Sequence, residues 1–324
     1  YYLSRVYMPK IIVIGSATRD IFIDAESLKK EKNFCFPFGE KTEIEKVRFF
    51  SGGGGINVAT TFALQDLKTN FCGVIGQDLI GAEIIKELKE KKININLLKI
   101  KKDKTTDLGM IFHANKERTI ILCHNASKSL NQKDIDLKKL KNTDWIYIAP
   151  LWGKSGNLTE KLISFAKKNK IKTALNPSLD QLSLKKISRI INQVDVLILN
   201  SQEASFLTKI QPFQEKSVIH KIASLTKAIV IITKGKKGAI CFDGKFLYYI
   251  PAQEMKVIDA TGAGDSFGSG FVTGLIKGID MEKSLTLAMS NAIANIGVIG
   301  ANQGLLKKGQ KLLKIKIRKT KWLV

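Results

Sequence analysis

The sequence predicts a three-layer α/β/α protein, in which helices cover both faces of a mainly parallel central sheet. Short apolar runs of strand length alternate along the chain with longer segments of helical periodicity. Parallel strands need such crossover segments between them, so this alternation is typical of a parallel sheet. The length of 324 residues and the hydrophobic content of 44% suit one large domain with a small appendage, or two small domains.

The expected elements begin with a buried strand at Ile11–Ile14, which ends at Gly15. Five later runs have the length and apolar character of strands: Phe71–Ile75, Trp145–Ala149, Ile171–Leu175, Val194–Leu199 and Ala228–Thr233. Helical patterns lie among them at Asn57–Leu67, Gly81–Lys92, Leu158–Lys168, Gln202–Thr208 and from Asp265 to about Lys277. Residues 239–250 are typical of a hairpin that turns at Asp243-Gly244.

Two segments, residues 33–50 and 107–123, interrupt this alternation. Both contain stretches of strand-like alternation, and a polar turn at Ala114–Arg118 divides the second segment. We expect antiparallel strands that form a small accessory sheet over one edge of the main domain. Ordinary edge strands of the main sheet are the alternative interpretation.

Both ends of the chain are expected to lie outside the main domain, which we place at residues 9–306. Met8 directly precedes the first strand, so residues 1–8 are interpreted as an N-terminal extension without function. Residues 307–324 form a Lys-rich tail, for which a solvated terminal strand or helix is expected. No apolar run reaches the roughly 18 residues of a membrane span, and the first seven residues lack the apolar centre of a signal peptide.

The four cysteines are widely spaced and form no C-x-x-C motif: Cys35, Cys72, Cys123 and Cys241. This spacing indicates neither a zinc site nor a disulfide framework. Cysteine usage therefore predicts a reduced, cytoplasmic location, and no membrane association is expected. Cys72 and Cys241 lie in apolar strand patterns and are predicted to be small core residues.

The formal net charge of +24 favours, at first sight, a nucleic acid or an anionic membrane as partner. However, only six of the 53 basic residues are Arg, the side chain suited to bidentate contacts with phosphates and bases. The lysines are spread over the whole chain. We therefore predict a solvated Lys-rich surface and no nucleic-acid partner, while the positive field would still attract anionic nucleotides.

The strongest chemical signal is the motif from Val257 to Phe267, which opens a long helical pattern. Gly262 and Gly264 allow the backbone tight conformations and close approach to a ligand. The N–H groups of Gly262–Asp265 at the helix start, Ala263 among them, would then face an anion. Asp265 stands at the same helix start, where it could cap the helix. The combination favours phosphoryl transfer, with Asp265 as the base that accepts the hydroxyl proton.

Competing phosphate-binding motifs fail on this chain. The G-x-x-x-x-G-K-[ST] pattern of P-loop proteins is absent. Phe267 stands where a dinucleotide G-x-G-x-x-G motif needs its third glycine, so that motif fails as well.

A second glycine-rich segment runs from Gly52 to Gly55 and leads directly into a helix. Such a turn presents bare backbone to a ligand, because no side chains stand in the way. Asn57 follows it and could form hydrogen bonds with substrate hydroxyls. A flexible loop without function is the alternative interpretation.

Together these two motifs resemble the two signatures of the ribokinase-like (PfkB-type) carbohydrate kinases over about residues 10–305. The G-G-x-G-x-N signature corresponds to Gly52–Asn57, and the D-T-x-G-A-G-D signature corresponds to Asp259–Asp265 with an Ala before the Thr. The resemblance implies an ATP-dependent kinase of the ribokinase-like fold that needs Mg²⁺. It also implies that residues 33–50 and 107–123 form a lid over the sugar site, through which a homodimer would form.

The resemblance also assigns roles to individual positions. Asp20, Gly52, Gly53 and Asn57 would bind the acceptor. Glu203, in the N-x-x-E motif that begins at Asn200, would hold Mg²⁺ through water. Asp259 and Thr261, with Gly297–Gly304, fall where many members hold a monovalent cation such as K⁺. The nucleotide would contact five residues: Asn200, Thr233, Gly235, Gly238 and Asn291.

The strand ends support part of this assignment without the resemblance. Asn200 ends an apolar strand and Glu203 opens the next helix, and ligands of open α/β sheets bind beyond such strand ends. A capping box formed by the same two residues is compatible with this role.

Two departures bear on the acceptor. Gly54 replaces the Lys that ribokinases proper carry in the first glycine motif, and Pro150-Leu151-Trp152 lacks their sugar-binding Glu. Trp152 or the Phe34–Phe38 cluster could instead stack on a ring. We therefore predict transfer of the ATP γ-phosphoryl group to a hydroxyl of a sugar or sugar-like molecule. A nucleoside kinase and a catalytically silent ligand sensor on the same fold are the alternatives.

Overall fold

The computed structural model describes residues 7–114 and 117–322. Residues 1–6 of the predicted N-terminal extension, the tip of the predicted 107–123 hairpin at 115–116, and the last two residues of the tail lie outside this range. Among the described residues, no helix is both long enough and apolar enough to cross a membrane.

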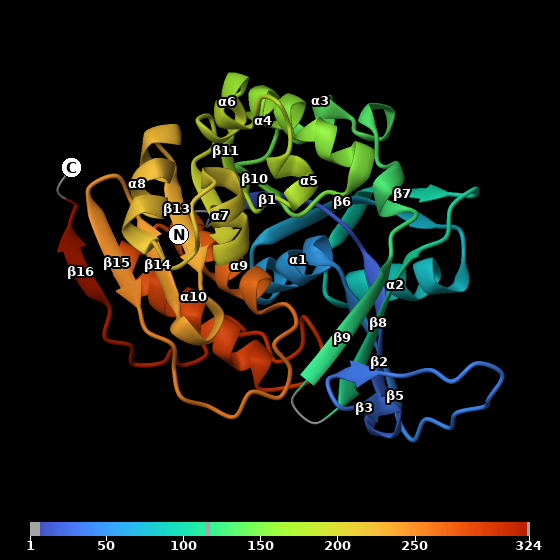
Figure 1. Cartoon of the computed structure of the whole chain (residues 1–324). Helices are drawn as coiled ribbons and strands as arrows, with labels where there is room; N and C mark the ends of the chain where they lie inside the picture. The colour runs from blue at the N-terminus through green and yellow to red at the C-terminus, as the bar shows by residue number, and fades with distance from the viewer. Residues whose placement is uncertain (1–6, 115–116, 323–324) are drawn as a thin grey trace.

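A ten-stranded sheet forms the centre of the molecule (Figure 1), in the order β16-β15-β14-β13-β12-β11-β10-β1-β6-β7. Seven neighbouring strands run parallel: β1 (Lys10–Ile14), β6 (Lys68–Gly76), β7 (Asn94–Lys101), β10 (Trp145–Ile148), β11 (Lys172–Leu175), β12 (Val196–Asn200) and β13 (Ile229–Thr233). Three antiparallel strands extend one edge: β14 (Ala239–Phe242), β15 (Phe246–Ile250) and β16 (Arg318–Lys321). The predicted mainly parallel sheet and the hairpin at 239–250 are confirmed.

Helices cover both faces of this sheet, as predicted (Figure 1). One face carries α3 (Leu137–Leu140), α4 (Leu158–Lys168), α5 (Leu179–Leu182), α6 (Ile187–Ile191), α7 (Ser201–Thr208) and α8 (Glu215–Leu225). The other face carries α1 (Gly54–Leu64), α2 (Leu79–Glu90), α9 (Ala263–Ile276) and α10 (Met281–Ile296). Successive strand residues feed the two cores, since Ile12 lies in the first and Ile11 in the second.

A separate four-stranded sheet, in the order β5-β2-β8-β9, forms the lid beside the main sheet (Figure 1). Its strands are β2 (Thr18–Asp24), β5 (Val47–Gly52), β8 (Asp107–Ala114) and β9 (Glu117–Cys123). The predicted accessory sheet is therefore confirmed, and residues 107–123 form the predicted antiparallel pair. The sheet also contains one strand that was not predicted, β2, which pairs with both β5 and β8.

Residues 33–50 are less regular than predicted. Only β4 (Asn33–Phe34), which pairs with β3 (Lys29–Lys30), and the start of β5 are strands in this range. Residues 35–46 form no helix or strand, and Phe38 in this stretch is fully exposed. Pro37 cannot donate a ladder hydrogen bond, and the polar run that follows has no apolar face to bury.

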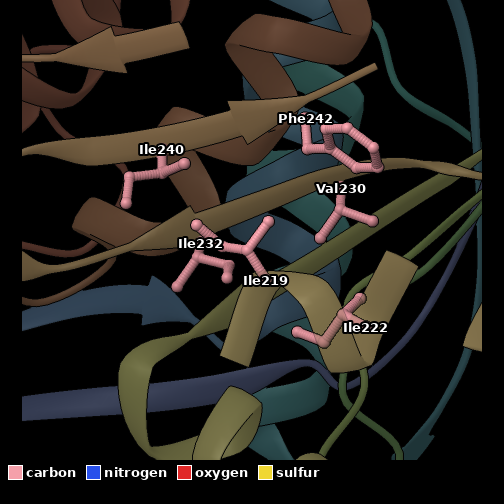
Figure 2. A pocket seen from close by; sticks show the side chains of 6 residues that line it. All are labelled: Ile219, Ile222, Val230, Ile232, Ile240 and Phe242. Carbon is pink, nitrogen blue, oxygen red and sulfur yellow. The ribbon is translucent and has the colours of Figure 1, made fainter. Parts of the chain in front are cut away.

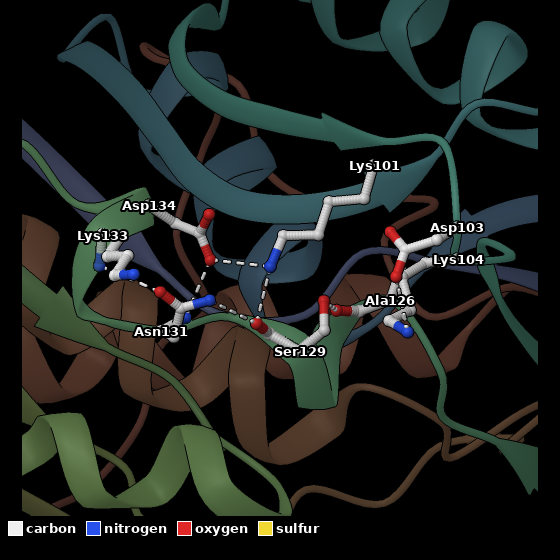
Figure 3. Close-up of polar contacts among 8 residues, drawn as sticks. All are labelled: Lys101, Asp103, Lys104, Ala126, Ser129, Asn131, Lys133 and Asp134. Carbon is white, nitrogen blue, oxygen red and sulfur yellow. Dashed lines mark hydrogen bonds and ion pairs between the residues drawn. The ribbon is translucent and has the colours of Figure 1, made fainter.

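Short 3-10 turns complete the chain: η1 (Glu26–Leu28), η2 (Ser127–Ser129), η3 (Gln132–Asp134), η4 (Gly153–Asn157) and η5 (Gly235–Lys237). A polar cluster ties the end of β7 to the segment around η2 and η3 (Figure 3). In it, the Lys101 ammonium donates to the Ser129 carbonyl at 2.7 Å and to the Asp134 carboxylate at 2.8 Å. This cluster fixes an edge of the sheet.

An apolar hollow lies between α8 and the sheet (Figure 2), lined by Ile219, Ile222, Val230, Ile232, Ile240 and Phe242. None of these side chains can donate a proton, accept one or hold an ion. The hollow is therefore a packing feature of the core and carries no chemistry.

The end of the Lys-rich tail joins the fold as the edge strand β16, whose own side chains are exposed. Trp322 follows it and packs against Phe242, with 5.5 Å between the ring centroids. The Trp322 N–H also donates to the Lys245 carbonyl at 2.8 Å. Ile315 and Ile317 of the tail also pack against the core, so Trp322 is one of several anchors of the tail.

Replacing this anchor tests the role of the tail. Trp322→Ala should lower the free energy of unfolding by about 1–3 kcal/mol, less than for a fully buried Trp because the ring is only partly covered. Lys321→Ala removes an exposed side chain of the same strand and should change stability by less than about 0.5 kcal/mol. Urea unfolding of both variants measures the difference. Equal stability of the two would show that the tail is not part of the cooperative unit.

Candidate active site

The predicted site residues gather at the carboxyl ends of the parallel strands, where the strand order reverses around β1. Ligands of open α/β sheets bind at such a reversal, because the connections there leave a crevice. The backbones of Gly15, at the end of β1, and Gly55, in α1, approach so closely that a Cβ on Gly15 would lie 2.8 Å from the Gly55 Cα. Glycine at both positions therefore brings the first glycine-rich loop onto the sheet edge.

Gly53 is the N-cap of α1 and has a φ of +88°, a conformation that side chains disfavour. A Cβ there would also lie 2.9 Å from the Ser16 carbonyl oxygen. Two constraints thus require glycine at this position, and the loop is short and fixed as predicted.

The Asp20 carboxylate lies between two glycines of the lid. A Cβ on Gly52 would fall 1.9 Å from Asp20 Oδ2, and a Cβ on Gly109 would fall 2.7 Å from Asp20 Oδ1. The Thr18 hydroxyl donates to Asp20 Oδ1 at 2.7 Å and fixes the rotamer of the carboxylate. Sequence analysis missed Gly109 because a lone glycine inside a strand pattern carries no specific signal.

The second glycine motif forms the start of α9, also as predicted. Gly262 is the N-cap, with a φ of +77°, and a Cβ there would lie 2.1 Å from the Ala301 carbonyl oxygen. Gly264 is exposed, with nothing within 4 Å of the position of a Cβ. The N–H groups in the first turn of a helix have no partner within the helix, so the backbone of Gly264 and Asp265 can serve an anion. The Ala263 N–H donates to the Ala260 carbonyl at 3.4 Å, a long bond with which the predicted anion contact would compete.

Asn57 and Asp265, 208 residues apart, meet in this crevice. The Asn57 side-chain amide donates to Asp265 Oδ2 at 2.9 Å, which joins the two glycine motifs directly. A Cβ on Gly54 would lie 3.7 Å from Asp265 Oδ1, so this glycine faces the same carboxylate.

A buried amide behind Asn57 holds it in this orientation. Asn302 donates to Asn57 Oδ1 at 3.1 Å and to the Ser51 carbonyl at 2.6 Å. Its own oxygen accepts from the Lys91 ammonium at 3.3 Å and from the Gln303 amide at 3.1 Å. Because Asn57 Oδ1 is engaged, its NH₂ group must face Asp265. Sequence analysis had placed Asn302 only within the cation-binding segment Gly297–Gly304.

The carboxyl groups of the crevice resist ionisation. Burial raises the pKa of Asp265 to about 6, the Asn57 hydrogen bond opposes this shift, and the charge of Asp20 adds to it. Burial likewise raises the pKa of Asp20 to about 6, with the Thr18 hydrogen bond opposing and the charge of Asp259 contributing. Such values near neutrality suit a group that exchanges a proton during a reaction.

Asn200 and Glu203 form the predicted capping box at the start of α7. Asn200 Oδ1 accepts from the N–H groups of Gln202 and Glu203, both at 2.8 Å, and Glu203 Oε2 accepts from the Asn200 N–H at 2.8 Å. Burial raises the pKa of Glu203 to about 7, the Asn200 N–H lowers it, and the charge of Asp265 raises it. A cation beside these two carboxylates would favour their ionised forms.

The predicted nucleotide loop follows β13. Thr233 ends this strand beside Asn200 in the parallel register, so the two residues share one edge of the sheet. Gly235 and Gly238 have φ values of +54° and +81°, and a Cβ on Gly238 would lie 2.1 Å from the Ile250 carbonyl oxygen. Gly238 thus lies tightly against the end of β15, whereas Gly235 has nothing within 4 Å of the position of a Cβ.

Asn291, predicted to contact the nucleotide, is engaged in hydrogen bonds within the protein. Its side chain is 1% exposed and donates to Thr61 Oγ1 at 3.2 Å and to the Ser266 carbonyl at 2.8 Å. Its oxygen accepts from the Leu306 N–H at 2.9 Å. With both donors and the acceptor used inside the protein, Asn291 joins α10 to α9 and α1, and its contact with the nucleotide stays a prediction.

Asp259 and Thr261 are adjacent, as the predicted monovalent-cation site requires, but their surroundings do not suit a cation. The Thr261 N–H and hydroxyl both donate to Asp259 Oδ1, at 2.9 and 2.7 Å. The Arg118 guanidinium from the lid donates to the same oxygen at 3.0 Å, and the Gly300 N–H donates to Oδ2 at 3.1 Å. Donor groups surround this carboxylate, so K⁺ does not fit the site as it stands.

The aromatic candidates for stacking divide between packed and exposed side chains, since Phe36 and Phe38 are exposed. Trp152 stacks on His124, with 5.0 Å between the ring centroids. Phe34 and Phe36 lie against Phe112 of the lid at 6.1 and 5.3 Å.

Comparisons with known proteins identify the family and the fold. The pfkB family carbohydrate kinase model matches residues 8–308. The ribokinase of Lactococcus lactis subsp. lactis is 28% identical over 315 residues, which cover 95% of this chain and 98% of that protein. The nucleoside kinase of Methanocaldococcus jannaschii is 26% identical over 285 residues, which cover 85% of this chain and 86% of that protein.

The fold has solved counterparts as well. The structure of Arabidopsis thaliana ribokinase complexed with ribose and ATP matches with a TM-score of 0.76 at 21% identity, covering 93% of this chain and 96% of that one. The ribokinase-like architecture predicted from the two glycine motifs is thereby confirmed. With a family match that spans nearly its whole length, the chain belongs to the PfkB family of carbohydrate kinases, phosphotransferases that act on an alcohol group.

Proposed function

We propose that this enzyme transfers the γ-phosphoryl group of ATP to a hydroxyl of a sugar or sugar-like molecule, with Asp265 as the general base. One observation carries the proposal: the Asn57 amide and the Asp265 carboxylate meet at 2.9 Å between the two glycine motifs. The acceptor loop and the anion-binding helix start therefore share one point. The relatives include a ribokinase and a nucleoside kinase, and both names support this reaction class.

In the proposed step, the acceptor hydroxyl gives its proton to Asp265 while its oxygen forms a bond to the γ-phosphorus. The bond from that phosphorus to the β–γ bridging oxygen breaks, and ADP leaves. The N–H groups of Ala263, Gly264 and Asp265 stabilise the charge on the moving phosphoryl group. The helix dipole of α9 adds to this stabilisation, because its positive end points to the same place.

The acceptor is bound by four residues: Asp20, Gly52, Gly53 and Asn57. The carboxylate of Asp20 accepts hydrogen bonds from substrate hydroxyls, and the bare backbone at Gly52 and Gly53 lets the ring approach. Asn57 uses its contact with Asp265 to align the hydroxyl with the base. Such alignment lowers the entropy cost of reaching the transition state.

The nucleotide is proposed to lie along the edge formed by Asn200, Thr233, Gly235 and Gly238. Mg²⁺ would be held beside Glu203 through water, where its charge offsets the carboxylates and the phosphates. The residues of the chain would orient ATP, and closure of the lid would exclude water from the crevice.

An acceptor with a ring base, as in a nucleoside, is the second candidate, because the relatives include a nucleoside kinase. A homodimer through the lid is favoured by exposed apolar side chains on its two edge strands: Val47, Phe49, Ile120, Ile121 and Leu122.

The proposed base predicts a specific loss. Asp265→Asn should lower kcat roughly 10²–10⁴-fold, because the variant cannot accept the hydroxyl proton. For the wild type, kcat/KM should rise between pH 5 and pH 7, with its midpoint near the pKa of about 6, and this limb should vanish in the variant. Steady-state kinetics across this pH range measure both effects. Near-normal kcat in the variant would show that another group is the base.

Thermal unfolding is the control for that variant. A carboxyl with a raised pKa binds its proton more tightly in the folded state, so its contribution to stability falls as pH rises through about 4 to 6. At pH 7.5 the ionised Asp265 therefore costs stability, and Asp265→Asn should melt at the same or a higher temperature. Inactivity with retained melting then reports on chemistry and not on folding.

The position of Asp20 predicts a separate effect on acceptor binding. Gly52→Ala places a methyl group where Asp20 Oδ2 lies, so the carboxylate must move. The KM for the acceptor should rise roughly tenfold or more, equivalent to about 1.4 kcal/mol, with a smaller change in the KM for ATP. Gly156→Ala is the matched control, because a Cβ there would meet its neighbours at an ordinary 3.5 Å. Equal KM values for the acceptor in Gly52→Ala and Gly156→Ala would show that Asp20 does not bind the acceptor.

A further inference from the structure

The lid reaches the loop before the catalytic helix through one ion pair. Arg118 of β9 donates to the Asp259 carboxylate at 3.0 Å, across 141 residues of sequence. The Asp259 side chain is fully buried, whereas that of Arg118 remains 32% exposed. A buried carboxylate needs a compensating positive charge, and the guanidinium of the lid provides it here.

The other partners of Asp259 form the framework of the anion-binding turn. The Thr261 N–H and hydroxyl and the Gly300 N–H complete its hydrogen bonds. Thr261 leads directly into Gly262, the N-cap of α9, and Gly262 packs against the carbonyl of Ala301. Asp259 therefore fixes two loops, the one at Thr261 and Gly262 and the one at Gly300 and Ala301. These loops determine where the N–H groups of the first turn of α9 point.

We propose that Arg118 is a positioning residue which supplies, from within the chain, the positive charge that a monovalent cation would bring to Asp259. This inference rests on the proposed kinase function. When the lid closes, Arg118 neutralises Asp259 and sets the turn at Thr261 and Gly262. When the lid opens, Asp259 loses its counter-charge and the turn loses this support. Lid closure and assembly of the phosphoryl site are thus one event, and turnover is independent of K⁺.

The test compares Arg118→Met, which keeps the length of the side chain without its charge, with Arg118→Lys, which keeps the charge. Arg48→Met is the matched control, because Arg48 is a lid arginine in β5 opposite Phe22 in the register. Each protein is studied in KCl and in tetramethylammonium chloride, both at about 0.1 M so that screening is equal.

Thermal unfolding gives the first readout and needs no substrate. Wild type and Arg48→Met should melt at the same temperature in both salts. Arg118→Met should melt lower in tetramethylammonium chloride and regain part of the loss specifically in KCl, because K⁺ can then enter beside Asp259. A K⁺-dependent rise for the wild type, or none for Arg118→Met, would overturn the proposal even if no acceptor were found.

Turnover with ATP and the best acceptor gives the second readout. The kcat of the wild type should change less than twofold between the two salts. The kcat of Arg118→Met should fall roughly 10–100-fold without K⁺ and recover when K⁺ is added. Without K⁺, the kcat of Arg118→Lys should lie between those of the wild type and Arg118→Met. Wild-type turnover that requires K⁺, or an Arg118→Met enzyme as active as wild type without it, would contradict the assignment. If Arg118→Met does not fold, kcat of Arg118→Lys is compared with and without K⁺. A kcat equal to that of the wild type in both salts would contradict the assignment.

Discussion

The hydrogen bond from Asn57 to Asp265 is the contact on which the rest of the site depends. It joins the helix that follows the first glycine loop to the helix that follows the second. In the proposed mechanism this contact would bring acceptor and phosphoryl donor to one point. Its direction is set by Asn302, which occupies the far side of Asn57 and leaves only the NH₂ group free to face the carboxylate. The glycines at Gly53 and Gly262 serve this contact, because both helices must begin at these points for Asn57 and Asp265 to meet.

Gathering several carboxyl groups in one buried crevice raises their pKa values. Asp20, Asp265 and Glu203 are all held above the usual range by burial, and the charges of neighbouring carboxylates add to the effect. A stable resting protein would avoid such a cluster, whereas an enzyme that binds a metal–nucleotide complex supplies the missing positive charge on binding. Asp259, in the loop before α9, has its counter-charge already present, since the Arg118 guanidinium of the lid pairs with it.

Much of the fold was predictable because local patterns are strong where strands are buried on both faces. The run Ile11–Ile14 and the Leu158–Lys168 helix appear in the structure within a residue of their predicted bounds. The β2 strand was missed because its role depends on partners far away in sequence, β5 and β8, which no local pattern shows. The glycine motifs were predictable for a different reason, since positive φ and close backbone approach admit few other residues.

The site was less predictable where a polar residue could serve either the ligand or the scaffold. Asn291 was predicted at the nucleotide, yet all of its hydrogen bonds are made inside the protein. Arg118 gave no signal, because an isolated arginine in a polar turn is indistinguishable from a solvated one until the lid is folded. Residue type and spacing indicate the chemistry of such groups, while their partners are decided by tertiary packing.

The most direct measurement is a coupled ATP-consumption assay with Mg²⁺ against a panel of sugars, sugar phosphates and nucleosides. Strong turnover on an acceptor, with the phosphoryl group found on its hydroxyl, is the predicted result. ATP binding without turnover on any member of the panel would contradict the proposed phosphotransfer to this acceptor class and would favour a ligand sensor on the same fold.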